Sequence, residues 1–257
     1  MTGFSAPDSV CAGGLHASPN FGPRRDGRAV DCIILHYTGM AGAEAALRAL
    51  CDPKREVSCH YLIHEDGAVV QLVPEAMRAW HAGASSWHGE ADMNSRSIGI
   101  EIVNPGHAGG AEGGAIPPFP DVQIDAVIAL CRDITRRRAI PAERVLGHSD
   151  IAPGRKIDPG ETFAWERLHK AGVGHWVAPA PPVKGKTLAP GDAGRDVALL
   201  QRRLARYGYG LDVSKVYDAQ TERVVRAFQR HFRPALVDGR ADSSTRRTLG
   251  ALLGALA

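Results

Sequence analysis

Residues 32–38 read Cys-Ile-Ile-Leu-His-Tyr-Thr, an apolar run that ends on polar side chains. The β-branched and apolar residues before His36 are typical of a buried strand. Side chains alternate between the two faces of a strand, so Cys32, Ile34 and His36 share one face. The run therefore predicts a sheet strand that carries a histidine at its end.

Further segments of alternating character surround this run. Strands are predicted at 30–37, 59–64, 68–72, 97–103 and 144–147, and helices at 42–51, 121–138 and 162–170. A hairpin turn is expected at 65–67, Glu-Asp-Gly. Strands interleaved with helices predict an α/β fold, a central mixed β-sheet flanked by helices. Residues 1–27 are rich in Gly, Pro and Ser, and we expect an irregular arm there.

The chain is expected to hold two domains joined by a linker. The first spans 1–177, the Pro-rich segment 178–187 is the linker, and 188–257 forms a small all-α domain of three helices. The first of these helices covers 196–206, Thr221 caps the second, and Ser243 or Ser244 starts the third.

Composition excludes several classes of protein. The chain has 257 residues with 44% hydrophobic and 23% charged residues, and its net charge is only +3. No apolar stretch is long enough to span a membrane, and no nucleic-acid recognition motif accompanies the basic run at 136–138. The five cysteines show no disulfide framework, and no signal peptide is visible. We expect a monomer, and the unpaired cysteines and the missing signal favour the cytoplasm.

Two histidines and one aspartate indicate a metal site. His36 is joined by His148, in Gly-His-Ser-Asp, and by Asp158, in Lys-Ile-Asp-Pro-Gly. Two imidazoles and a carboxylate leave a zinc ion one open position for water, which is typical of hydrolytic sites.

Glu101 is an acid in an otherwise apolar strand, 97–103. It shares a face with Gly99 and Val103, and such an acid calls for a reason. Glu101 and His36 would project from neighbouring strand ends into one cleft.

Five stretches of the first domain occur together in the order of a known family. They are 34–38 (Ile-Leu-His-Tyr-Thr), 57–63 (Val-Ser-Cys-His-Tyr-Leu-Ile), 79–83 (Ala-Trp-His-Ala-Gly), 97–101 (Ser-Ile-Gly-Ile-Glu) and 147–160 (Gly-His-Ser-Asp-Ile-Ala-Pro-Gly-Arg-Lys-Ile-Asp-Pro-Gly). The region 28–177 therefore resembles the zinc-dependent N-acetylmuramoyl-L-alanine amidases of the AmpD type, relatives of phage T7 lysozyme and the peptidoglycan recognition proteins. The tail resembles a peptidoglycan-binding three-helix module, except at 216–218, where that module usually has a glycine-containing turn.

The resemblance implies one Zn²⁺ per chain, with His36, His148 and Asp158 as its ligands. It also implies that Glu101 is the catalytic acid and that Lys156 stabilises the oxyanion of the tetrahedral intermediate. The bond cleaved would be the amide between the lactyl group of N-acetylmuramic acid and L-alanine of the stem peptide, in peptidoglycan or in muropeptides.

Other residues match family positions or lie beside the Glu101 strand. Those predicted to contact substrate are Tyr37, His60, His81, Trp87, Asn94 and Arg96. Of these, His60 is expected to support a ligand. Three other histidines are expected at the surface, namely His64, His88 and His107.

Two alternatives stay open beside the amidase. One is a recognition protein that binds peptidoglycan without cutting it, and the other is hydrolysis of a different amide at the same metal site. The retained ligand set favours the enzyme. The resemblance of the tail to a wall-binding module implies the cell envelope or periplasm, with the cytoplasm as the alternative. The tail would act as a tether that raises the local concentration of the first domain at the polymer. Deletion of 183–257 would then leave cleavage of small soluble muropeptides nearly unchanged.

Overall fold

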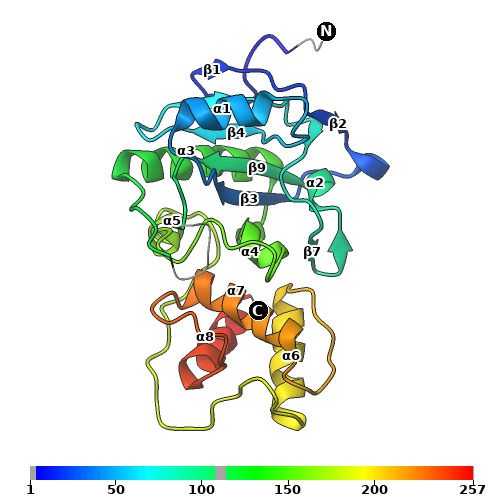
Figure 1. Cartoon of the computed structure of the whole chain (residues 1–257), viewed down its shortest axis with the longest axis vertical. Coiled ribbons are helices and arrows are strands. Elements are labelled where there is room, and N and C mark those ends of the chain that lie inside the picture. Colours follow the sequence, from blue (N-terminus) through cyan, green and yellow to red (C-terminus); the bar gives the residue numbers. More distant parts are fainter. Residues whose placement is uncertain (1–3, 108–113, 257) are drawn as a thin grey trace.

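A six-stranded mixed sheet forms the centre of the first domain in the computed structural model, which describes residues 4–107 and 114–256 (Figure 1). The strands lie in the order β1 (Gly14–Leu15), β5 (Val69–Gln71), β4 (Tyr61–Ile63), β9 (Ser97–Ile102), β3 (Cys32–Tyr37) and β10 (Val145–Gly147). Strand β3 pairs in parallel with both β9 and β10, whereas β4 and β5 form the antiparallel hairpin predicted at 65–67. The predicted mixed sheet is confirmed.

The N-terminal arm is more regular than its composition suggests. Strand β1 adds to the edge of the sheet beside β5, and β2 (Phe21–Pro23) pairs with β6 (Met77–Ala79). A 3₁₀ turn follows at Arg25–Gly27. These strands are too short to show an alternating pattern, so the sequence predicted only an irregular arm, and most of the described arm is irregular.

Helices cover both faces of the sheet. On one face, the apolar residues of β3 and β9 pack against α3 (Asp121–Arg138), whose bounds match the predicted helix. On the other face, α1 (Ala43–Cys51) packs over β4 and β5 at one end. At the other end lie α4 (His148–Ile151) and the C-terminal domain. His36 and Glu101 therefore lie on the second face, between two separate apolar clusters.

The C-terminal domain consists of α6 (Arg195–Tyr207), α7 (Ala219–Phe232) and α8 (Ser243–Gly254), as predicted. The predicted cap Thr221 is wrong, because Thr221 lies in the first turn of α7. Asp218 is the cap, and its carboxylate accepts a hydrogen bond from the Thr221 backbone N–H at 2.8 Å. Asp242 caps α8 in the same way, one residue before Ser243. Both caps satisfy backbone N–H groups that a helix start leaves without partners.

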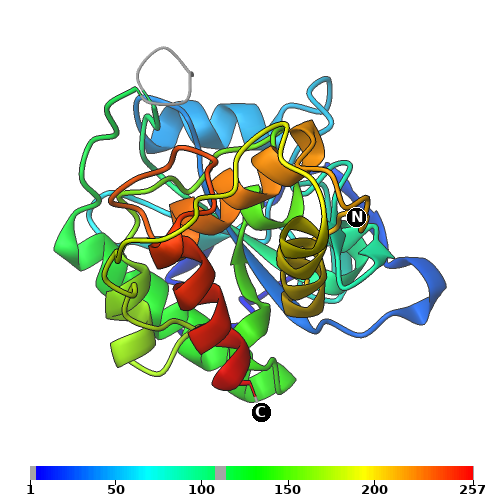
Figure 2. The same ribbon diagram turned by 90° about the horizontal axis from the view of Figure 1, so that it is seen from below.

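The three-helix domain packs directly against the first domain (Figures 1 and 2), which differs from the predicted tether. Trp87 and Ile151 of the first domain belong to the same apolar cluster as the core of the three helices. The linker is also fixed, because the backbone N–H groups of Ala180 and Val183 donate to hydroxyls on α8 at 2.9 Å. The linker therefore lies along α8 instead of spanning open solvent.

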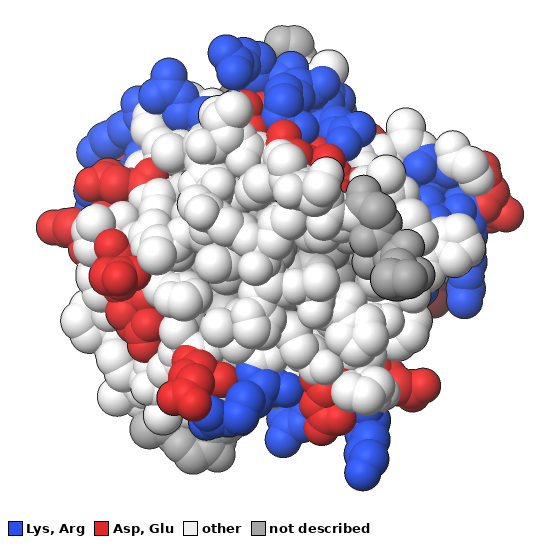
Figure 3. Space-filling model, turned by 90° about the horizontal axis from the view of Figure 1, so that it is seen from above, with Lys and Arg blue, Asp and Glu red and all other residues white. Residues whose placement is uncertain are grey.

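Charge is unevenly distributed on the end of the molecule that faces away from the three helices. There the Lys, Arg, Asp and Glu side chains gather at the margin and leave an uncharged centre (Figure 3). No helix in the described parts of the chain combines the length and the apolar character that a bilayer crossing requires.

The candidate metal and catalytic site

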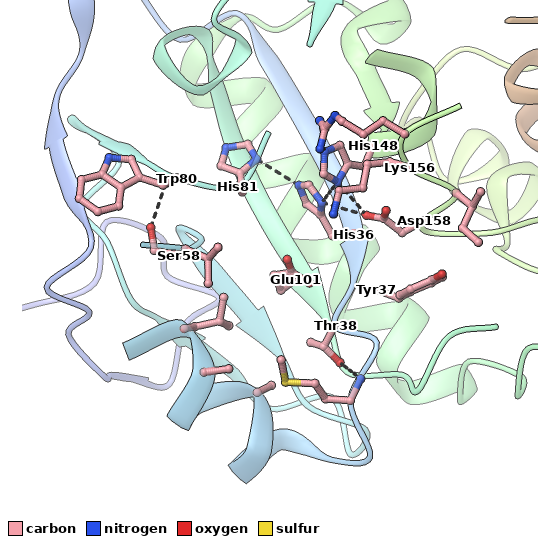
Figure 4. Close-up of a pocket in the computed structure, with 17 residues that line it drawn as sticks. His36, Tyr37, Thr38, Ser58, Trp80, His81, Glu101, His148, Lys156 and Asp158 are labelled. Atoms are coloured by element: carbon pink, nitrogen blue, oxygen red, sulfur yellow. Dashed lines mark hydrogen bonds and ion pairs between the residues drawn. The ribbon is translucent and has the colours of Figure 1, made fainter. Parts of the chain in front are cut away.

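A cavity of about 430 Å³ opens on the second face of the sheet, between the α1 end and the α4 end. His36 and Glu101 lie directly opposite each other in the parallel register of β3 and β9, and both line the cavity. The predicted meeting of these two side chains at neighbouring strand ends is confirmed. Figure 4 shows Glu101 on the cavity floor, with His36, His148 and Asp158 grouped beside it.

His36, His148 and Asp158, hereafter the ligand cluster, turn one donor atom each toward a common point. The His36 Nδ1 lies 2.9 Å from the His148 Nδ1 and 3.0 Å from the Asp158 Oδ2, and the last two atoms are 3.1 Å apart. Tetrahedral zinc with bonds of about 2.0–2.2 Å would separate its ligands by about 3.3 Å. All three residues are buried and could hold one metal ion.

The second nitrogen of His148 shows which tautomer the ring adopts. Its Nε2 lies 3.1 Å from the Ala82 carbonyl oxygen, which can only accept a hydrogen bond. The Arg155 Nη2 lies 3.3 Å from the same nitrogen, but both of its hydrogens are donated to the carbonyl oxygens of Ala82 and Ala84. The proton of a neutral ring is therefore on Nε2, and the Nδ1 lone pair points into the ligand cluster.

His36 is oriented by a chain of hydrogen bonds that ends on the backbone. The Ser97 hydroxyl donates to the Met93 carbonyl oxygen at 2.6 Å, so its oxygen accepts from the His81 Nε2 at 3.2 Å. The His81 Nδ1 then accepts from the His36 Nε2 at 3.0 Å. Once more the Nδ1 lone pair faces the cluster, so His81 supports a ligand as well as lining the cavity.

Two lone pairs and a carboxylate oxygen thus converge with no proton assigned between them. Burial, followed by the neighbouring His148 ring, which disfavours a second positive charge, lowers the pKa of His36 to about 4 and keeps its ring neutral. Burial alone would raise the pKa of Asp158, but His148 and His36 lower it overall, which keeps the carboxylate charged. Three lone-pair-bearing atoms that face one another repel unless a cation lies between them. The chemistry of the ligand cluster therefore fits a divalent zinc ion.

Glu101 supplies a carboxyl group that the rest of the fold does not use. Its Oε2 is inaccessible to solvent and has no hydrogen-bond partner among the described residues. Burial raises its pKa well above the usual value, the charge of Asp158 adds to this rise, and Lys156 opposes it. Buried carboxyl groups are normally hydrogen-bonded. A carboxyl oxygen that has no such partner and lies beside a metal site is suited to proton transfer.

The predicted Lys156 and Tyr37 both line the cavity. Lys156 is close enough for its charge to act on both Glu101 and His36. Arg155 forms a further wall and donates to the carbonyl oxygens of Ala82 and Ala84. Lys156 thus places a positive charge at the edge of the ligand cluster.

Four of the predicted substrate residues lie outside the cavity lining. The His60 ring is fully buried, where Nδ1 accepts from the Gly99 backbone N–H and Nε2 contacts Arg24 and the Met77 carbonyl oxygen. Trp87 is packed beneath the C-terminal domain, against Tyr209.

Asn94 and Arg96 shape the structure around the cavity without lining it. The Asn94 Oδ1 accepts from the backbone N–H groups of His81 and Ala82, at 3.0 and 2.8 Å. Arg96 forms an ion pair with Asp31. Asn94 therefore fixes the loop that provides the partners of both histidine ligands.

Some site features escaped the sequence reasoning. Ser97 stands at the start of the Ser-Ile-Gly-Ile-Glu stretch, but its role depends on His81, which is distant in sequence. Gly99 is noticeable as a glycine inside a strand, because a Cβ there would meet the His81 ring at 2.4 Å. The expected surface position of His107 is wrong, since it is 3% exposed and bonds to the Tyr37 hydroxyl at 3.0 Å.

Comparison with known proteins agrees with this site. Residues 26–161 match the N-acetylmuramoyl-L-alanine amidase family, and residues 193–249 match a peptidoglycan binding domain. The N-acetylmuramoyl-L-alanine amidase AmiD of Escherichia coli is 38% identical over 87% of this chain and 82% of its own length. The 1,6-anhydro-N-acetylmuramyl-L-alanine amidase AmpD of Enterobacter cloacae is 42% identical over 44% of this chain and 56% of its own length.

Two solved structures share the whole architecture. The complex of E. coli AmiD with anhydro-N-acetylmuramic acid-L-Ala-D-gamma-Glu-L-Lys has a TM-score of 0.74 and 36% identity, and covers 93% of both chains. AmpDh3 from Pseudomonas aeruginosa in complex with anhydromuramic pentapeptide has a TM-score of 0.72 and 32% identity, and covers 94% of this chain and 96% of its own. Family match, relatives and fold agree, and the chain belongs to the N-acetylmuramoyl-L-alanine amidase family of amide hydrolases.

Proposed function

We propose that the chain hydrolyses the amide between the lactyl group of N-acetylmuramic acid and L-alanine of the stem peptide, with one zinc ion held by the ligand cluster. The convergence of two imidazole lone pairs and one carboxylate oxygen beside the Glu101 carboxyl group carries this proposal. When bound, zinc would supply a Lewis acid that activates water and polarises the amide carbonyl. The two relatives solved with anhydromuramyl peptides support a muramyl peptide as substrate.

Each protein group has a distinct role in the proposed reaction. Glu101 accepts the proton that the attacking water loses and passes it to the amide nitrogen as the C–N bond breaks. The products are a lactyl carboxylate and the free amine of L-alanine. Lys156 stabilises the negative charge that develops on the carbonyl oxygen. His81 and Ala82 keep the two histidine ligands in the tautomer that the metal requires.

The setting of this reaction is proposed to be the cell envelope. The match of residues 193–249 to a peptidoglycan binding domain supports contact with the wall polymer. All the groups named come from one chain, so a monomer would suffice. Binding without cleavage has no observation in its favour, because the full ligand set and Glu101 are present.

Metal analysis joined to an activity assay tests the proposal. The purified protein should contain one zinc per chain. It should release from a muramyl peptide a free peptide that has L-alanine at its N-terminus. His148→Ala should lose both zinc and activity, whereas His16→Ala, at an exposed histidine, should lose neither. Equal zinc content in the wild type and His148→Ala would refute the ligand assignment.

A further inference from the structure

Asp150, Tyr209 and His231, hereafter the interface cluster, form a buried contact between the two domains. Asp150 is 0% exposed. Its Oδ1 accepts from the Tyr209 hydroxyl at 2.7 Å, and its Oδ2 accepts from the His231 Nδ1 at 2.7 Å. Both donors come from the C-terminal domain. A buried carboxylate of the catalytic domain is thus held mainly by the other domain.

Asp150 belongs to the short turn that carries a metal ligand. Helix α4 is four residues long and begins at His148, and the Asp150 Oδ2 also accepts from the Gly147 backbone N–H at 2.8 Å. Within the same turn, the Ser149 backbone N–H donates to the Asp158 carbonyl oxygen at 3.0 Å. So short a helix does not persist by itself, and its geometry depends on such outside contacts.

The orientation of His231 is itself fixed. Its ring stacks on Trp165 of the first domain at a centroid distance of 3.7 Å and on Phe232 at 3.8 Å. Because two stacking contacts hold this ring, the bond to Asp150 has a defined direction, and a shift of α4 would strain it.

The adjacent residue of α7, Arg230, begins a second chain of contacts that ends at the cavity. The Arg230 Nε lies 3.6 Å from the Glu161 Oε2, which is 3.0 Å from the His107 Nε2. The Nδ1 of His107 lies 3.0 Å from the hydroxyl of Tyr37, a cavity residue. Helix α7 is therefore connected to the site through two separate chains of contacts, one through Asp150 and one through Glu161 and His107.

We infer that Tyr209 and His231 are positioning residues, through which the C-terminal domain sets the geometry of the metal ligands. They hold Asp150, Asp150 holds the α4 turn, and that turn holds His148 and the backbone of Asp158. The C-terminal domain then completes the metal site in addition to any binding of the wall. This inference rests on the zinc site proposed above.

Replacing Tyr209 by Phe tests the inference, with Tyr217→Phe as its matched control. The Tyr217 hydroxyl also donates one buried hydrogen bond, to the Gly239 carbonyl oxygen at 2.6 Å, but within the C-terminal domain. The readouts are zinc affinity by chelator competition and the visible absorption spectrum of the cobalt-substituted protein, which reports ligand geometry. We expect Tyr209→Phe to weaken zinc binding by about tenfold, the lower end for outer partners of metal ligands, and to shift the spectrum. Tyr217→Phe should leave both as in the wild type.

A second pair of variants decides the matter if Tyr209→Phe does not fold. His231→Asn keeps a side-chain N–H near the position of Nδ1, whereas His231→Leu removes it. His231→Asn should retain a spectrum close to that of the wild type, and His231→Leu should not. Zinc affinity and spectra identical to the wild type in Tyr209→Phe and His231→Leu would overturn the inference. A wild-type protein that binds no zinc would instead overturn the proposed function.

Discussion

The ligand cluster and the interface cluster are both buried, and His148 and Asp150 are only two residues apart. In the interface cluster every bond to the Asp150 carboxylate comes from a donor, namely a hydroxyl, a ring N–H and a backbone N–H. In the ligand cluster, the groups that face one another are acceptors. The protein itself therefore satisfies the Asp150 carboxylate of the interface cluster, whereas the ligand cluster requires a cation.

The difference shows how similar residues acquire different roles. A carboxylate and a histidine occur in both clusters, so composition does not separate them. What separates them is where the ring protons lie. In the ligand cluster the far ring nitrogens carry the protons, whereas the His231 Nδ1 faces a carboxylate oxygen and carries its proton inside the interface cluster. A buried carboxylate that is surrounded by hydrogen-bond donors therefore indicates a structural role. A buried carboxylate that faces other acceptors indicates a metal site.

Removing residues 183–257 should change the protein more than any single substitution. It would uncover Trp87 and Ile151, which share a core with the lost helices, and would remove two of the donors to Asp150. We expect a chain that folds poorly and loses activity on soluble muropeptides and on sacculi alike. Thermal unfolding and hydrolysis of a soluble muropeptide measure this.

As a control for that truncation, residues 183–257 are added to the truncated chain as a separate polypeptide. This addition should restore part of the activity. A truncated chain with wild-type kcat/KM on the soluble substrate would contradict the shared core and return the C-terminal domain to the role of a tether.

Glu101→Gln addresses the ligand-cluster side of the comparison. The variant keeps the shape of the side chain and all three ligands, but it cannot accept a proton. We expect kcat to fall by about 10²–10⁴-fold, with zinc content and KM little changed. The exposed Glu65→Gln is the control and should keep the wild-type kcat. An unchanged kcat in Glu101→Gln would assign Glu101 a structural role.

The sequence predicted the ligand side of the comparison far better than the interface side. The meeting of Glu101 and His36 could be predicted because period-two alternation shows which face of its strand each side chain occupies. The parallel register of the two strands then sets the two residues opposite each other. Asp150 was visible only as part of a motif, since its partners Tyr209 and His231 lie in another domain. Local patterns carry no information on which helix faces a given carboxylate.

Substrate contacts were predicted less well for a related reason. Proximity in sequence to the Glu101 strand suggested that Trp87 and Arg96 would reach substrate. The chain instead turns Trp87 toward the C-terminal domain and Arg96 toward Asp31. The direction of a loop side chain depends on tertiary packing, which no periodicity encodes.

Gly208→Ala should weaken the domain contact without touching the ligand cluster. Gly208 has a φ of 137°, and a Cβ there would lie 2.3 Å from the Trp87 ring. Gly191→Ala, with a φ of 92° and nothing within 4 Å, is the control for the backbone strain alone. We expect Gly208→Ala to cost about 1–3 kcal/mol more in unfolding free energy than the control, as overpacking does. Equal losses in denaturant unfolding would show that Trp87 moves aside readily.

The effect that is smallest at neutral pH concerns His60, which lies outside the cavity. Burial and then the charge of Arg24 lower its pKa to about 3, so the folded protein holds the ring neutral. The unfolded chain, with a histidine pKa of about 6.5, binds an extra proton between these values, so stability falls as the pH falls from 6.5 toward 3. His60 alone contributes a slope of about 1.4 kcal/mol per pH unit in this window.

His60→Gln should remove that slope and leave the KM for a muramyl peptide at pH 7 unchanged, because no atom of His60 lines the cavity. Denaturant unfolding at several pH values, with a chelator present, measures the slope for the wild type and the variant. The exposed His16→Gln controls for the loss of an imidazole. A raised KM together with an unchanged pH slope of stability would contradict the structural role assigned to His60. It would make His60 a substrate residue, as its place in the Val-Ser-Cys-His motif suggests.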